Sequence, residues 1–186
     1  MSFFSLHRPT PGSLAAFTEQ QRTLPVTCRG ALEARAGFSF KRTLGFLGDG
    51  PEVFAQAVSG LEAWAVYPAW MNLYPNPANV REGQVVALVT GVPPIWAVSA
   101  VRIVAVERGA RRFSFTLGTL PQHALTGLER FSVYRDDAET VWYEITAVSK
   151  PRHPLAKLGV PALRLVQRRF ARDSVRSLRR FVTQAL

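Results

Sequence analysis

Two side chains in one short stretch, His123 and Glu129, have the residue types and the spacing that proton transfer requires. If the stretch around Glu129 is a strand, its alternating geometry puts Glu129 on the same face as the apolar Phe131 and Val133. Burial raises the pKa of a carboxyl group, so Glu129 can serve there as an acid, a base or an anchor for a polar group of a ligand. The alternative is that Glu129 pairs with a buried arginine such as Arg102, or accepts hydrogen bonds from turn amides.

A histidine and a glutamate within six residues of each other can move a proton between them. No serine or cysteine nucleophile motif accompanies His123 and Glu129, so the sequence favours a non-enzymatic function. His7 and His153 have no partners at the spacing of metal ligands, and the chain has no Walker-type or GxGxxG phosphate loop. We therefore predict neither a metal ion nor a cofactor.

The elements that would position these residues follow one another in a clear order. Five segments from residue 84 onward have β character, and the short turns between them predict an antiparallel meander. Before them we expect a strand at 38–44, a glycine-rich turn at 45–50, a helix from Pro51, and a long irregular connection at 67–83. The five predicted strands of the meander are 84–91, 96–107, 111–120, 126–134 and 140–149.

The chain ends in an amphipathic helix that is predicted to start near Pro161 and to run to about Thr183. One face is apolar and is expected to pack on the sheet. A second stripe carries like charges at i+4 spacing, which destabilise an isolated helix unless an anion compensates them. Nucleic acid or an acidic lipid surface would do so, and the alternatives are Asp173, acids elsewhere on the domain, or solvent. The stripe consists of Arg164, Arg168, Arg172 and Arg176.

Composition indicates a folded domain with an uneven charge. Of the 186 residues, 47% are hydrophobic and 19% are charged, and most of the net charge of +10 lies in the basic C-terminal helix. The single cysteine, Cys28, excludes an intramolecular disulfide. No secretory signal and no transmembrane segment are predicted, so a cytoplasmic location is expected. Residues 1–37 are expected to form an N-terminal arm packed on a single domain at 38–186.

Short motifs along the chain form one pattern: Leu-Gly-Thr-Leu at 117–120, Gly-Leu-Glu-Arg-Phe at 127–131, Val-Trp-Tyr-Glu-Ile at 141–145 and Ser-Lys-Pro at 149–151. The other members are Gly48, Gly50, Phe54, Trp64, Arg-Ile-Val at 102–104, His123 and Gln-Arg-Arg at 167–169. Together they resemble the domain of unknown function 1990 family (UPF0548-like). Two positions depart from the family: Leu117 stands in place of an aromatic residue, and Leu128 in place of the first of two adjacent acids. The second departure argues against a reaction that needs both carboxylates.

The resemblance implies an α+β helix-grip fold of the START and Bet v 1-like kind, a curved antiparallel sheet around a long C-terminal helix with an apolar cavity between them. Such cavities usually bind small molecules, so the favoured function is binding an unidentified small apolar or amphipathic ligand. Binding of an anionic surface through the arginine stripe, and an enzyme using His123 and Glu129, are the alternatives. The predicted ligand-binding residues are Arg102, Phe113, Phe115, Thr119, His123, Glu129, Phe131 and Tyr143.

Overall fold

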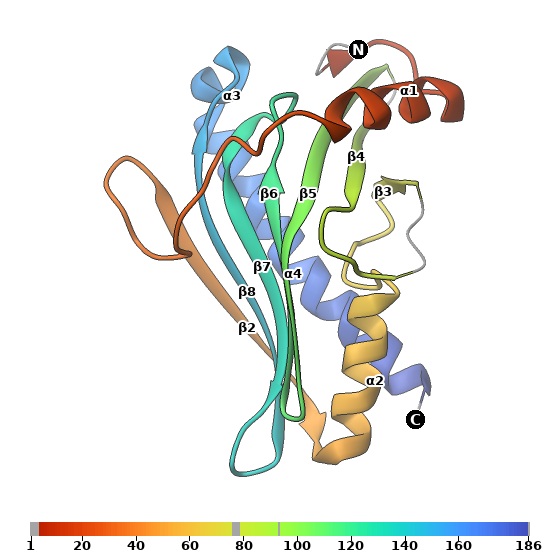
Figure 1. Ribbon diagram of the computed structural model, residues 1–186, viewed down its shortest axis with the longest axis vertical. Helices are drawn as coiled ribbons and strands as arrows, with labels where there is room; N and C mark the ends of the chain where they lie inside the picture. The colour runs from red at the N-terminus through yellow and green to blue at the C-terminus, as the bar shows by residue number, and fades with distance from the viewer. Residues whose placement is uncertain (1–3, 76–78, 93, 186) are drawn as a thin grey trace.

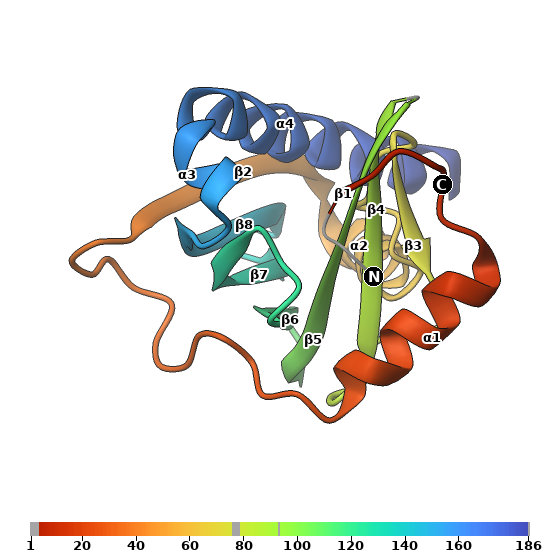
Figure 2. The same ribbon diagram turned by 90° about the horizontal axis from the view of Figure 1, so that it is seen from above.

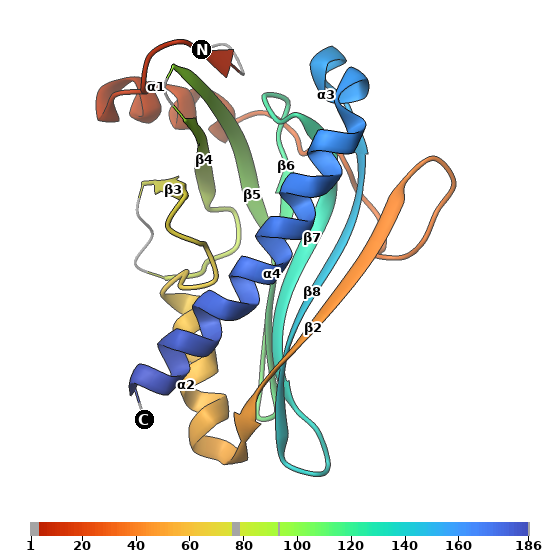
Figure 3. The same cartoon turned by 180° about the vertical axis from the view of Figure 1, so that it is seen from behind.

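The computed structural model describes residues 4–75, 79–92 and 94–185 of the chain. A curved antiparallel sheet has the strand order β2-β8-β7-β6-β5-β4-β3, with β1 paired to β5 outside this path (Figure 1). Helix α4 runs along the concave side of the sheet, as the view from behind shows (Figure 3). The strands are β1 (Phe4–Ser5), β2 (Ser39–Asp49), β3 (Met71–Tyr74), β4 (Val85–Val92), β5 (Ile95–Gly109), β6 (Arg112–Thr119), β7 (Leu125–Arg135) and β8 (Thr140–Pro151). The helices are α1 (Pro11–Arg22), α2 (Gly50–Glu62), α3 (Pro154–Leu158) and α4 (Val160–Ala185).

The strands from β4 to β8 confirm the predicted meander, because each pairs antiparallel with its neighbour in the chain. The pairing register places Leu117, Glu129 and Ala147 in one row across β6, β7 and β8. Since side chains in such a row point to the same face of a sheet, the predicted inward phase of Glu129 is also confirmed. Strand β3 lies inside the connection that was expected to be irregular throughout.

The glycine-rich segment at 45–50 is not the predicted turn. Strand β2 continues through it to Asp49, with a bulge between Phe46 and Gly48, and α2 begins directly at Gly50. Gly45 is needed for packing, since a Cβ atom there would lie 2.4 Å from Cγ1 of Val175 on α4. The missing side chain therefore lets the helix lie directly against β2.

Helix α2 and the second half of α4 fill one end of the concave side. They approach closely at Gly60, where a Cβ atom would lie 2.5 Å from Cδ1 of Leu178. The buried residues of α4 all lie at Phe170 or beyond: Phe170, Ser174, Leu178 and Val182. The core is thus packed at this end, while the residues of α4 before Phe170 are exposed or half-buried.

Helix α1 covers the opposite, convex face of the sheet, away from α4 (Figure 2). Its Leu14 and Phe17 pack against alternate residues of β4 and β5. The guanidinium of Arg102 donates hydrogen bonds to the carbonyl oxygens of Gln21 and Arg22, at 3.1 and 2.6 Å, where the helix ends. Arg102 therefore holds the N-terminal segment to the sheet and faces away from the concave side.

Candidate functional site: a cavity under the first half of helix α4

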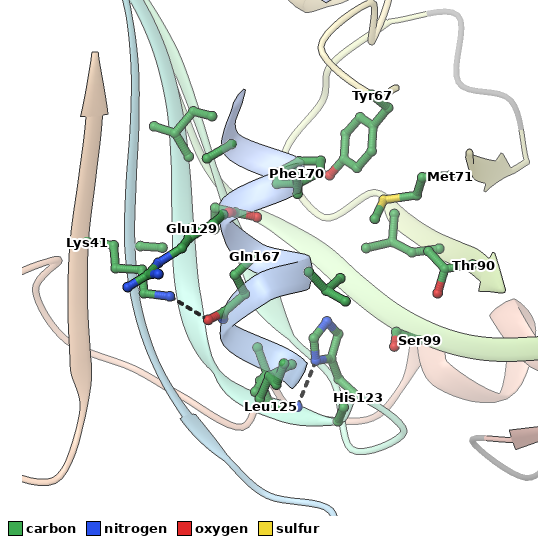
Figure 4. Close-up of a pocket in the computed structure, with 18 of the residues that line it drawn as sticks. Lys41, Tyr67, Met71, Thr90, Ser99, His123, Leu125, Glu129, Gln167 and Phe170 are labelled. Atoms are coloured by element: carbon green, nitrogen blue, oxygen red, sulfur yellow. Dashed lines mark hydrogen bonds between the residues drawn. The ribbon is translucent and has the colours of Figure 1, made fainter. Parts of the chain in front are cut away.

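A cavity of about 260 Å³ lies between the concave face of the sheet and the first half of α4 (Figure 4). Its walls are mostly apolar and come from β2, β4, β5, β7, β8 and α4, from Tyr67 and Met71 after α2, and from the loop after β6. Small side chains on the strands, Ala97, Ser99 and Ala147, leave this space open. The polar residues among the lining are Lys41, Thr43, Thr90, Ser99, His123, Glu129, Gln167 and Arg168, besides Tyr67.

Glu129 faces the cavity from β7 without a partner. Neither a hydrogen bond nor an ion pair to its carboxyl group occurs among the described residues, and Arg102, its predicted partner, lies on the other face. Burial raises the pKa of Glu129 from 4.5 to about 7. At neutral pH the group is therefore divided between its two protonation states, and it can either donate or accept a hydrogen bond.

His123 lines the same cavity from the loop after β6, but it is not paired with Glu129. The two hydrogen bonds drawn in Figure 4 join Lys41 to Gln167 and the backbone of Leu125 to His123. The amide of Leu125 donates to Nδ1 of His123 at 3.0 Å, so the ring proton of the neutral imidazole is on Nε2. Burial lowers the pKa of His123 to about 4, which keeps the ring neutral at physiological pH. His123 thus offers a donor rather than a base, which leaves Glu129 as the acid or base of an enzymatic mechanism.

Tyr67 adds a third polar group, from the segment after α2. Its hydroxyl is buried and has no hydrogen-bond partner among the described residues. Burial raises the pKa of Tyr67 well above its ordinary value, and the nearby charge of Glu129 raises it further. Tyr143 differs, because its hydroxyl lies 2.7 Å from Oγ of Ser174. A buried hydroxyl without a partner costs about 1–3 kcal/mol, which a ligand with a matching group would offset.

The other predicted ligand-binding residues lie elsewhere. Thr119 lines a smaller adjoining cavity of about 70 Å³, and its hydroxyl is engaged with the backbone of Gly127 and the hydroxyl of Thr27. Four predicted aromatic residues lie in the packed core and not on the cavity wall, because α2, Trp64 and the second half of α4 fill that end of the sheet. These four are Phe113, Phe115, Phe131 and Tyr143.

Several residues of the cavity were not predicted. Strand phase could have identified Lys41 and Ala147, since both share the row of Glu129 across β2, β8 and β7. The helical period could have identified Gln167, three residues before the buried Phe170. Tyr67 gives no such signal, because it belongs to a segment without a regular repeat.

The arginine stripe of α4 divides into two parts. Asp173 lies 3.4 Å from Nε of Arg172 and 3.5 Å from Nη1 of Arg176, so these two arginines have an acid close by. Arg164 and Arg168 have no ion pair among the described residues. The charge that lacks compensation is therefore at the first half of the helix, beside the cavity.

Other site types receive no support from the part of the chain that the structure describes. There, no three His, Cys, Asp or Glu side chains gather where they could hold a metal ion. Cys28 is buried as a free thiol. None of the helices in the described ranges has the length and apolar character required to cross a bilayer.

The curved sheet, the long C-terminal helix and the cavity between them define a helix-grip domain. The Zhui aromatase/cyclase from Streptomyces sp. R1128 superposes on 79% of this chain and 94% of its own, with a TM-score of 0.56 and 12% identity. Ara h 8.0201 superposes on 80% of this chain and 99% of its own, with a TM-score of 0.50 and 11% identity. At such identities the likeness shows the fold alone.

The sequence identifies the family. The model of the family described as Domain of unknown function (DUF1990) matches residues 25–177, and the chain belongs to this family. A UPF0548 protein of Arabidopsis thaliana is 31% identical over 144 residues, which cover 74% of this chain and 70% of that protein. A UPF0548 protein of Deinococcus radiodurans is 28% identical and covers 94% of this chain and 96% of its own length.

Proposed function

We propose that this protein binds a small amphipathic molecule in the cavity under α4. The observation that carries the proposal is an apolar cavity of about 260 Å³ lined by three residues that each have a polar group without a hydrogen-bond partner among the described residues. These groups are the carboxyl group of Glu129, the Nε2 proton of His123 and the buried hydroxyl of Tyr67. Apolar walls with a few convergent polar groups are the usual form of a small-molecule site.

The three groups also indicate which polar ligands would fit. His123 donates, Tyr67 can donate or accept, and Glu129 can do either near neutral pH. A hydroxyl or carbonyl group on an apolar body would satisfy them, whereas a strictly apolar ligand would leave them unpaired. We therefore expect amphipathic compounds to bind more tightly than hydrocarbons of the same size.

A cavity-filling substitution tests this function. Ala147→Phe places a ring in the space between β8 and α4, and Ala105→Phe, at an exposed position of β5, is the matched control. Thermal unfolding would be followed with a panel of single-chain amphiphiles, and native mass spectrometry would detect a ligand carried through purification. We expect stabilisation of the wild type and the control but not of Ala147→Phe. Absence of any stabilisation, or equal stabilisation of Ala147→Phe, would refute the proposal.

A second candidate is binding of an anionic surface, nucleic acid or acidic lipid, through the arginine stripe. The observation in its favour is a surface hollow of about 410 Å³ between β2 and α4 whose lining includes four arginines. Binding of either polyanion should weaken steeply with salt, and Arg172→Gln with Arg176→Gln should reduce it. Lack of binding at low ionic strength would exclude this function. The four arginines are Arg168, Arg172, Arg176 and Arg179.

A further inference from the structure

Four basic side chains gather where the cavity meets a second hollow in the surface. Lys41 and Arg168 line the cavity, and Lys150 and Arg164 line the adjoining hollow of about 400 Å³. Leu125, Leu163 and Gln167 line both spaces, so the two adjoin each other. No acid occurs among the residues that line the hollow in the described part of the chain. This end of the cavity is therefore strongly basic, and we call these four residues the basic mouth.

Lys41 shows that the protein itself does not compensate this charge. Its ammonium group donates to Oε1 of Gln167 at 2.7 Å, and among the described residues it forms no ion pair. Burial lowers the pKa of Lys41, and the charges of Arg168 and Arg164 lower it further. A cation that is partly desolvated beside other cations is destabilised, and a bound anion would relieve both effects.

Arginines further along α4 have more partners than those at the mouth, although Arg180 also has no ion pair among the described residues. Further along α4, Asp173 forms ion pairs with Arg169, Arg172 and Arg176. The guanidinium of Arg179 donates two hydrogen bonds to the carbonyl oxygen of Phe46, at 2.7 and 3.1 Å. Beside the cavity, Lys41, Arg164 and Arg168 have no acid close by among the described residues. A ligand that carries its own negative charge would compensate these three cations.

On the basis of the proposed function, we infer that the ligand is an amphipathic anion. Its phosphate or carboxylate head lies at the basic mouth, and its apolar body fills the cavity with a hydroxyl or carbonyl group that meets Glu129, His123 and Tyr67. Glu129 determines this orientation. Lys41, Ala147 and Glu129 occupy one row across β2, β8 and β7, so Lys41 and Glu129 are separated by two strand spacings, about 10 Å. An anionic head beside Glu129 would meet a carboxyl group, whereas at the mouth it meets cations.

Ligands with one chain and different heads separate this inference from the proposed function. Decyl phosphate, decanoate and decanol share a chain length, and inorganic phosphate supplies the head alone. Their affinities would be measured by calorimetry for the wild type, for Lys41→Met and for Arg168→Gln. Arg180→Gln is the matched control, because Arg180 is exposed on the same helix and lines neither space. Arg168 is also exposed, so its substitution does not disturb the core.

We expect the two anions to bind at least about tenfold more tightly than decanol, a difference of about 1.4 kcal/mol. Lys41→Met and Arg168→Gln should each weaken the binding of the anions but not of decanol, and Arg180→Gln should change neither. Equal affinity for decanol and decyl phosphate would overturn the inference while leaving the proposed function intact. Binding of inorganic phosphate as tight as that of decyl phosphate would also overturn it, since the chain would then contribute nothing. If none of the decyl compounds binds, both the inference and the proposed function fail.

Discussion

Replacing Glu129 with glutamine should make the protein more stable at alkaline pH and leave its stability in mild acid nearly unchanged. The pKa of Glu129 is about 7 in the folded protein and near 4.5 in an exposed chain. The folded state therefore binds more protons between these values, and the stability that the protonated group provides is lost as the pH rises through them. The full loss is at most about 3 kcal/mol, which corresponds to the whole difference between the two pKa values.

Chemical denaturation with urea, from about pH 5 to about pH 9, measures this effect as the difference between Glu129→Gln and the wild type. The variant must be compared with the wild type because His123 changes the stability with pH in the opposite direction to Glu129. Burial lowers the pKa of His123 to about 4, so its contribution is lost as the pH falls, and the two effects partly cancel in the wild-type curve. Subtracting the two curves leaves the contribution of Glu129 alone.

As the pH rises from about 5 to about 9, we expect the free energy of unfolding of Glu129→Gln to increase by about 2–3 kcal/mol relative to the wild type. Most of this increase should occur below about pH 7.5. Glu33→Gln removes an exposed carboxylate of the N-terminal segment and is the matched control, with a difference that should stay flat. Parallel curves for Glu129→Gln and the wild type would show that Glu129 is solvated or paired in solution, and would refute the reasoning about the cavity.

Two further substitutions test the packing around the cavity. Gly45→Ala should cost about 1–3 kcal/mol in urea unfolding, because the new methyl group meets the stiff side chain of Val175; a neutral result would mean that α4 does not lie directly on β2. Tyr143→Phe should cost about 1–2 kcal/mol, since it leaves the buried hydroxyl of Ser174 without its partner at 2.7 Å. Tyr67→Phe removes a hydroxyl that has no partner in the described part of the chain, and it should cost less than Tyr143→Phe; the reverse order would contradict the assigned hydrogen bonding.

The order of strands could be predicted because β-type residues and turn residues alternate at short intervals from residue 84 onward. The helix-grip fold was predicted from that order of strands together with the resemblance to the domain of unknown function 1990 family. The segment at 45–50 was misinterpreted for a physical reason, since a glycine that permits close packing looks the same in sequence as a glycine that permits a turn. Gly45 belongs to the first kind, and only its contact with Val175 of α4 reveals it.

The candidate site was predicted in part. Strand phase alone placed Glu129 on the concave face, and its position in the cavity depends on packing at the other end of the sheet. The same phase selected Phe115 and Phe131, but α2 and Trp64 bring further rings against them and close the space. Segments distant in sequence fill part of the space on the concave face, and they determine which inward residues still border a cavity. Local sequence patterns do not contain that information.

Helix α4 is anchored to the core only from Phe170 onward, while the cavity lies under the part before it. A small bend or partial unwinding of the first two turns would therefore open a passage for a ligand without exposing any of the buried core. If the cavity binds a ligand as proposed, the ligand could then enter and leave without global unfolding of the protein. Amide hydrogens at 164–169 should exchange with solvent faster than those at 174–182, and a bound ligand should slow the first group selectively.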